Sequence, residues 1–272
     1  MSSVDLLSEL DSLLREWWRV EHQHEHYLPT LEALKASSGD DQMKNNIWVR
    51  STLLECHLRH LQIFDLLKAE SFYEAWCQLE RLEIQLADIR TNKEHVEADF
   101  GQRFLANAVG SWQALYPYRI FFSSREIIKK ITCSICGSPR SIIKGCRHRK
   151  LKLYGGEICY DVVKEFEPIT WDVVSNPVCK SSVLFHPDGD RYEYAHIRAA
   201  LKLVATPRQW FMFYRVDVPF ARHTGIHSPS SPCPCLRSIK NYEACCMTKR
   251  WLHTDHIFMD FLTPMLISPH AR

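Results

Sequence analysis

Apolar residues recur at every third or fourth position along residues 4–115, which is the spacing of one face of an α-helix. Four helices are predicted, over residues 4–35 with a break at Pro29, 42–69, 71–89 and 93–115. A polar loop over residues 37–41 separates the first two, and Pro117 ends the last. Helices joined by short connections predict an antiparallel helical bundle with an acidic surface over residues 1–120.

The pattern changes after His148 to short runs rich in β-branched and aromatic residues. Strands are predicted over residues 158–163, 169–174, 182–185 and 210–218, with one helix over residues 194–204. A last amphipathic helix is predicted from apolar positions near the C-terminus, Trp251, Ile257, Phe258, Phe261 and Leu262. The predicted fold class is therefore α+β, with a helical bundle at 1–120, a small α+β domain at 121–228 and a C-terminal module at 229–272.

Four residues between the two predicted regions have the spacing of metal ligands. Cys133 and Cys136 are separated by two residues and followed by Gly137, and Cys146 and His148 come after a nine-residue loop. Three thiolates and one imidazole make the closed tetrahedral set of structural zinc, which has no open position for water or substrate. Cys159 is an alternative fourth ligand, because Gly155 and Gly156 would let the chain turn back toward the other cysteines.

A second cysteine cluster lies near the C-terminus, where Cys233-Pro234-Cys235 is followed by Tyr242 and by Cys245-Cys246. This segment resembles the SEC-C motif, a small zinc module at the C-terminus of the bacterial preprotein translocase ATPase and of many otherwise unrelated bacterial proteins. The resemblance implies a second zinc site and a docking role for a protein partner. The ligands that it implies are Cys233, Cys235, Cys245 and Cys246. The main body, with its Cys-x-x-Cys-Gly turn, is similar to uncharacterised proteins that carry such a tail.

Charge is distributed unevenly along a chain whose net charge is only +2. Residues 1–120 hold 12 basic and 19 acidic residues, whereas residues 121–272 hold 22 and 13. The excess is concentrated around the first cysteine cluster, in Arg125, Lys129, Lys130, Arg140, Lys144, Arg147, Arg149, Lys150 and Lys152. Such a stretch predicts contact with an acidic partner, with the acidic half of the chain, or with the phosphates of a nucleic acid.

Other residues with metal or thiol chemistry have simpler interpretations. His22 and His26 would lie one helical turn apart, which suits either a metal face with His24 nearby or a solvated helix end. Cys56 and Cys77 fall on apolar helical faces and are predicted to be core thiols. The aromatic run Trp112, Tyr116, Tyr118, Phe121 and Phe122 predicts a packing seam between the bundle and the cysteine region, with stacking on bases as the alternative.

Composition narrows the class of protein without naming an activity. The chain has 46% hydrophobic and 24% charged residues, which is ordinary for a globular protein, and no apolar run long enough to span a membrane. Eleven cysteines behind an acidic N-terminus, with no secretory signal, predict reduced thiols and metal ligands in the cytoplasm. No nucleotide-binding loop, Gly-x-Ser-x-Gly turn or His-Glu-x-x-His helix is found.

The favoured function is therefore that of a non-enzymatic adaptor that binds two structural Zn²⁺ ions and docks a protein partner. The alternative is a zinc-scaffolded nucleic-acid-binding protein that uses the stretch from Arg125 to Lys152. A metalloenzyme stays open, and so does a defence-related accessory role suggested only by the bacterial occurrence of the SEC-C motif.

Overall fold

The computed structural model describes residues 3–96, 98–141, 143, 145–219, 228–233, 240–249 and 251–260. The chain divides into two compact units, Met1–Leu201 and Lys202–Arg272. Both helices and small antiparallel sheets are present, as the α+β prediction requires. The three-part division at residues 120 and 228 stays a prediction.

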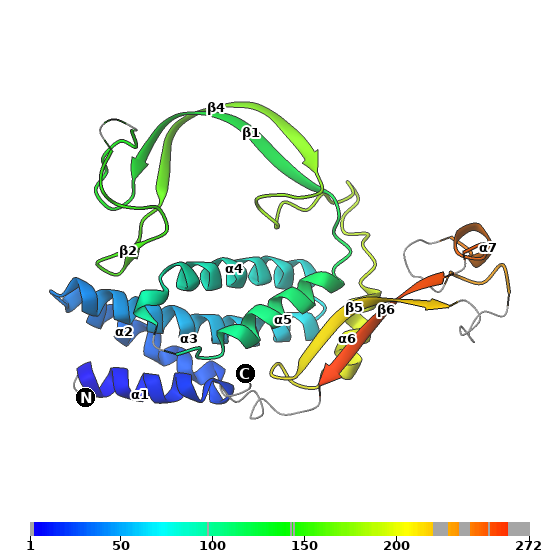
Figure 1. Cartoon of the computed structure of the whole chain (residues 1–272), viewed down its shortest axis with the longest axis horizontal. Coiled ribbons are helices and arrows are strands. Elements are labelled where there is room, and N and C mark those ends of the chain that lie inside the picture. The colour runs from blue at the N-terminus through cyan, green and yellow to red at the C-terminus, as the bar shows by residue number, and fades with distance from the viewer. Residues whose placement is uncertain are drawn as a thin grey trace. The chain divides into compact units, whose positions relative to one another are not determined.

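Helices fill the first part of the Met1–Leu201 unit (Figure 1). They are α1 (Ser3–Arg15), α2 (Tyr27–Ser37), α3 (Asp41–Lys68), α4 (Phe72–Thr91) and α5 (Gln102–Leu115). The longest, α3, packs against each of the other four. Its side chains and those of α4 form the core of this unit, with the fully buried leucines Leu53, Leu54, Leu67, Leu79 and Leu82. Burial of an apolar stripe on each helix therefore holds the helices together.

Local signals explain most of the helix boundaries. The predicted segments 42–69 and 71–89 agree with α3 and α4, and the Asp40 carboxylate caps α3 by accepting a hydrogen bond from the N–H of Gln42 at 2.9 Å. The segment 4–35 is divided into α1, two short 3₁₀ turns (Trp17–Arg19 and His22–His26) and α2. A helix from residue 93 was wrong, because only a 3₁₀ turn (Lys93–His95) forms before Gly101 introduces a left-handed residue ahead of α5.

A long two-stranded ribbon follows the helices (Figure 1). Strand β1 (Phe121–Cys133) pairs antiparallel with β4 (Asp161–Val174), and the short hairpin β2 (Leu153–Tyr154) and β3 (Glu157–Ile158) lies in the connection between them. The strand β1 was not predicted, and residues 182–185 form a single bridge from Val183 to Phe121 instead of a strand. Helix α6 (Ala195–Leu203) agrees with the prediction over residues 194–204.

An aromatic cluster packs the base of this ribbon on the helices. Trp76 of α4 contacts the rings of Tyr116, Tyr118 and Phe121, and its indole N–H donates to the carbonyl of Lys180 at 2.6 Å. The predicted seam therefore exists, and of its five residues only Phe122 is exposed.

The Lys202–Arg272 unit contains a second ribbon and one helical turn. Strand β5 (Trp210–Pro219) pairs antiparallel with β6 (Trp251–Asp260) along its whole length, and α7 (Tyr242–Cys245) precedes β6. The prediction of a helix through Trp251, Ile257 and Phe258 was wrong. This segment is a strand because a ten-residue partner is available to it, and strand pairing overrides local helical spacing. Phe261 and Leu262 lie outside the described residues.

No helix among the residues that the structure describes has the length and apolar character needed to cross a bilayer.

Candidate metal centres

Four predicted ligands meet where the connection between β1 and β4 folds back on itself. The donor atoms of Cys133, Cys136, Cys146 and His148 all lie within 4.8 Å of one another. Cys133 is the last residue of β1, and Cys136 follows in a turn closed by a 2.9 Å hydrogen bond from the N–H of Gly137 to the carbonyl of Cys133. Gly137 has φ +70°, a conformation that favours glycine. The local sequence thus folds both thiols to the same side.

The surroundings favour thiolates in the first half of this cluster. Burial opposes ionisation of the Cys133 thiol, but hydrogen bonds from the backbone N–H groups of Cys136 and Ile135 outweigh it and lower its pKa to about 6. Hydrogen bonds from Ser138 lower the pKa of the Cys136 thiol. The Cys136 sulfur in turn raises the pKa of His148. Anionic sulfurs beside an imidazole are the donor set of a soft or borderline cation such as zinc.

Cys159 lies beside this group without joining it. Its Sγ atom is buried and 3.6 Å from the Sγ of Cys133, yet it does not meet all four donors within the same 4.8 Å. The geometry therefore brings His148 into the four-donor set and leaves Cys159 next to it. The His148 ring also packs edge-on against Tyr154, which restricts its orientation.

Arg140 connects the cluster to its surroundings, a role that its position in the sequence did not predict. Its guanidinium donates to the Sγ of Cys159 at 2.9 Å, to the Sγ of Cys146 at 3.3 Å and to the carbonyl of His148 at 2.6 Å. The Nε–H donates to the carboxylate of Asp161 at 2.7 Å. A cation so placed offsets the negative charge of several thiolates and orients the ligands.

A second cluster forms in the Lys202–Arg272 unit. The sulfurs of Cys233, Cys245 and Cys246 lie within 4.8 Å of one another, with 3.7 Å between those of Cys245 and Cys246. Tyr242 packs against them in a small buried cluster, and the N–H of Cys246 donates to its carbonyl at 3.0 Å. Cys235, the remaining predicted ligand, lies outside the described residues.

The histidines of the first helical segment do not meet in a metal-binding group among the described residues. His22 Nε2 lies 2.9 Å from the Asp65 carboxylate, whereas His26 Nδ1 lies 2.6 Å from the carbonyl of Gln23. Cys56 is buried in the helical core, and burial raises the pKa of its thiol, as expected of a core cysteine. Cys77 is half-buried, and Cys179 is exposed.

The basic stretch around the first cluster is largely paired with acidic residues. The ion pairs are Arg125–Asp172, Lys129–Glu167, Lys130–Glu165, Arg140–Asp161, Lys150–Asp161 and Lys152–Glu94. Arg147 and Arg149 form no ion pair with a described residue, and the side chain of Lys144 lies outside them. Most of this positive charge is thus balanced by β4 and by the segment after α4, so the nucleic-acid interpretation gains no support here.

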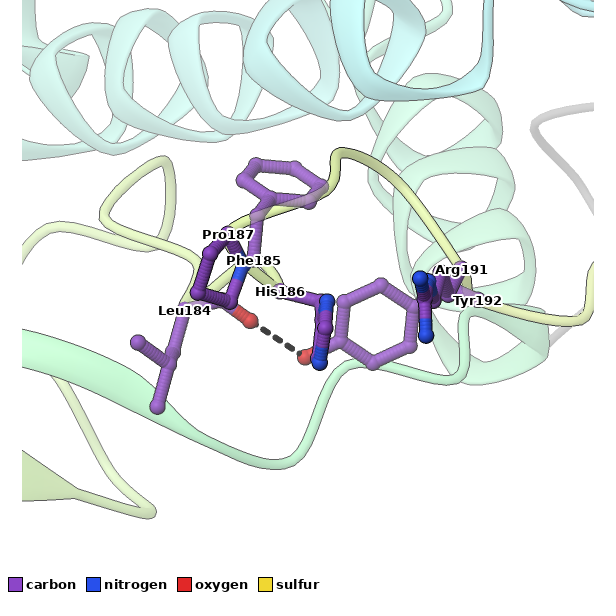
Figure 2. A pocket seen from close by; sticks show the side chains of 6 residues that line it. All are labelled: Leu184, Phe185, His186, Pro187, Arg191 and Tyr192. Carbon is purple, nitrogen blue, oxygen red and sulfur yellow. Dashed lines mark hydrogen bonds between the residues drawn. The ribbon is translucent and has the colours of Figure 1, made fainter.

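An apolar pocket of about 430 Å³ is formed by the loop before α6 (Figure 2). The hydroxyl of Tyr192 donates to the carbonyl of Leu184 at 2.8 Å and holds the loop closed. His186 and Arg191 both interact with the carboxylate of Asp188. The loop that forms this pocket is therefore held by its own hydrogen bond, and its charged side chains pair with each other. None of its residues belongs to a group that could hold a metal ion.

Geometry is the guide to function for this chain, because no protein-family model, no curated protein and no solved structure matches it.

Proposed function

We propose that this chain is a non-enzymatic interaction protein built around two structural zinc sites, which together support the docking of a protein partner. The observation that carries the proposal is the convergence of Cys133, Cys136, Cys146 and His148 within 4.8 Å. Four protein donors complete the coordination of zinc, and a complete shell has no position for a substrate. Three sulfurs and one nitrogen also favour zinc over magnesium or calcium, which prefer oxygen ligands.

The second site supports the same function. Cys233, Cys245 and Cys246 already supply three sulfurs, and Cys235 completes the set in the arrangement that the SEC-C resemblance implies. A zinc module of this kind would act as a docking tag. Thiol ligands need a reducing compartment, so the proposal keeps the protein in the cytoplasm.

The ribbon formed by β1 and β4 offers a surface for the partner. Along β1 a period of two places Phe122, Ser124, Glu126 and Ile128 on one face, where they pair with Val173, Trp171, Pro168 and Phe166 of β4. The β4 side chains of this face are largely exposed, with Trp171 at 71%, Val173 at 61% and Phe166 at 55%. Contiguous exposed apolar side chains of this kind are typical of protein-interaction sites.

The charges of the ribbon indicate what kind of partner fits. Lysine and arginine side chains of β1 already pair with acids of β4, in Arg125–Asp172, Lys129–Glu167 and Lys130–Glu165. These three pairs offset most of the charge on the ribbon, so a partner needs no highly charged surface to bind it. The occupant that we propose is an uncharged, apolar face of another protein.

Metal analysis of three variants tests the two sites. Plasma mass spectrometry of protein purified without added metal should find two zinc ions per chain, and one in Cys246→Ser. Cys133→Ser should lose the first ion and unfold the connection between β1 and β4, because metal binding there contributes folding free energy on the order of 10 kcal/mol. Cys179→Ser is the matched control, since Cys179 is exposed and belongs to neither cluster. Wild-type protein without zinc would exclude the proposal.

Partner docking is tested separately. Pull-downs from the native host would compare the intact chain, a chain lacking residues 232–272, and the double variant Trp171→Ser and Val173→Ser. A partner retained by the intact chain and lost from either altered chain supports docking through that region. A partner set that is identical for all three chains contradicts it.

A further inference from the structure

Cys159 is held beside the four-donor set of the Met1–Leu201 unit without belonging to it. Its Sγ lies 3.6 Å from the Sγ of Cys133, and the two side chains are buried, at 0% and 1% exposure. Three cysteines and His148 already supply the four donors that a structural zinc site requires. A fourth thiol in contact with a ligand sulfur is therefore not needed for coordination, and its position points to another role.

Backbone hydrogen bonds fix the contact between these two cysteines. Cys133 is paired with Asp161 in the register of β1 and β4. The N–H of Ser134 donates to the carbonyl of Tyr160 at 3.0 Å, and the N–H of Tyr160 donates to the hydroxyl of Ser134 at 2.8 Å. Because these bonds do not involve the donor atoms, Cys133 and Cys159 remain adjacent when the ion is lost.

Burial divides the four thiols into two pairs. Cys133 and Cys159 are buried and form the inner pair, whereas Cys136 is exposed and Cys146 is half-buried. The sulfurs of this outer pair, Cys136 and Cys146, lie within 4.8 Å of each other. Each thiol thus has a neighbouring thiol at a distance that side-chain rotation can shorten to a disulfide bond.

The number of thiols determines whether oxidation of the site is reversible. Three ligand cysteines form one disulfide and leave one thiol, which a peroxide can oxidise further to sulfinic acid, an irreversible product. Four thiols form two disulfides with none left over, and both bonds are reversed by thiol–disulfide exchange. Cys159 makes the number even.

We propose that Cys159 makes this site a reversible peroxide-sensitive switch, in which four thiols become two disulfides, Cys136–Cys146 and Cys133–Cys159, and the ion is released. The inference rests on the proposed zinc site and adds its regulation by a peroxide such as hydrogen peroxide. The thiolate is the form of cysteine that binds metals, so oxidation leaves only His148 of the original four donors.

Each disulfide forms in two steps that consume one peroxide. The Cys136 thiolate attacks one peroxide oxygen, the O–O bond breaks, and hydroxide leaves as a sulfenic acid forms on Cys136. The Cys146 thiolate then attacks that sulfur, the S–O bond breaks, and a second hydroxide leaves as the disulfide forms. Buffer protons convert both hydroxides to water. The two sulfurs lose two electrons in total, and the peroxide gains them.

The inner pair reacts after the outer pair. Loss of two thiolates releases the ion, and with it the binding free energy that keeps the connection between β1 and β4 folded. Peroxide then reaches the sulfur of Cys133 and forms a sulfenic acid there. The thiol of Cys159 attacks this sulfur, and the sulfenic hydroxyl leaves as water with the thiol proton.

Peptide mapping of the full-length, zinc-loaded chain tests the pairing. The four cysteines fall in three tryptic peptides, 131–140, 145–147 and 153–164. After treatment with hydrogen peroxide and alkylation of the remaining thiols, we expect one species in which two disulfides join all three peptides. A disulfide within 131–140, or a peptide 153–164 recovered with an alkylated thiol, overturns the proposal.

Zinc recovery measures the role of Cys159. First-site zinc is counted with a chromogenic chelator in the Cys246→Ser background, which is expected to retain only that ion. Peroxide should release about one ion per chain, and dithiothreitol with added zinc should restore it. Cys159→Ser should bind the ion equally before oxidation but recover less than about half of it afterwards, with sulfinic acid on a remaining cysteine. Cys179→Ser is the matched control and should recover fully, because Cys179 is exposed and belongs to neither cluster.

The outcomes separate this inference from the proposed zinc site. Zinc absent from the untreated wild-type chain contradicts the zinc site, and peptide mapping of the same metal-free chain still reads the pairing of the cysteines. Zinc that is released by peroxide and fully recovered by Cys159→Ser contradicts the switch alone. Loss of zinc from untreated Cys159→Ser would identify Cys159 as a ligand, which also overturns the switch.

Discussion

The guanidinium of Arg140 donates a hydrogen bond to the Sγ of Cys159 at 2.9 Å, and so holds a fourth thiol beside the four-donor set of three cysteines and one histidine. The same side chain contacts Cys146 and the backbone of His148. Arg140 can therefore orient Cys146 and His148 without being a metal ligand itself.

Replacing Arg140 with methionine should weaken zinc binding by about 10- to 100-fold, the usual effect of removing an outer partner of a metal ligand. Competition with a chromogenic chelator measures the change. The control is Arg149→Met, because Arg149 lies in the same connection and forms no ion pair with a described residue. Equal zinc affinity in wild type and Arg140→Met would show that the guanidinium has no part in holding the ligands.

Asn92 fastens the connection that carries the four-donor set to the end of α4. It is fully buried, and its amide donates to the carbonyl of Leu151 at 2.8 Å and accepts from the N–H of Leu153 at 3.0 Å. Asn92→Ala removes both bonds and should lower the free energy of unfolding by about 2–4 kcal/mol. Urea denaturation measures the loss. Asn46→Ala, which removes one long exposed hydrogen bond from Gln42, should change it by less than about 1 kcal/mol. Comparable losses in the two variants would contradict this assignment.

Gly101 has a conformation and a neighbourhood that exclude a side chain. Its φ is +79°, and an added Cβ would lie 2.7 Å from the ring of Trp17 and 2.9 Å from that of His57. Gly101→Ala should therefore destabilise the helical part by about 1–3 kcal/mol. Gly110→Ala is the opposite case, because Gly110 lies within α5 with no atom in the way, and it should stabilise by about 0.5–1 kcal/mol. Thermal unfolding of both variants checks the sign of each change.

Asp88 should make stability depend on pH in a specific direction. Burial raises its pKa in the folded chain, so the folded state binds more protons than the unfolded chain between the ordinary carboxyl pKa, about 4, and the raised value. The free energy of unfolding therefore falls as pH increases through that window. Asp88→Asn retains an oxygen that can accept from Tyr160, and it should flatten this fall and leave the protein at least as stable as wild type at neutral pH. A steeper fall in the variant would contradict the assignment.

Features specified by neighbouring residues could be predicted from the sequence. The helices α3 and α4 follow from regular apolar spacing over many turns, and Cys133 and Cys136 meet because a two-residue gap and Gly137 determine their turn. Three thiols of the C-terminal cluster likewise come together from closely spaced positions.

Features that depend on distant partners were missed. The residues of β1 alternate poorly between polar and apolar, and this strand exists because β4, some forty residues further along, pairs with it. The segment Trp251–Asp260 has apolar spacing that suits a helix, yet β5 provides a pairing partner. The roles of Arg140 and Asn92 were also missed, since each depends on contacts that appear only after the connection folds onto α4.

The register of the β1–β4 ribbon depends on how its two ends are held, and one end lies at the four-donor set. Three irregularities interrupt the pairing, between Arg125 and Glu126 and on either side of Lys130, and a shift by one residue would exchange the charged and apolar faces. One end of the ribbon is fastened near Phe121 by the bridge to Val183, and the other ends at Cys133, a member of the four-donor set. An ion bound at that end would close a long loop and oppose a shift of the register. Metal occupancy would then determine which side chains of the ribbon are exposed on each face. The surface available to a partner would therefore depend on whether the ion is bound.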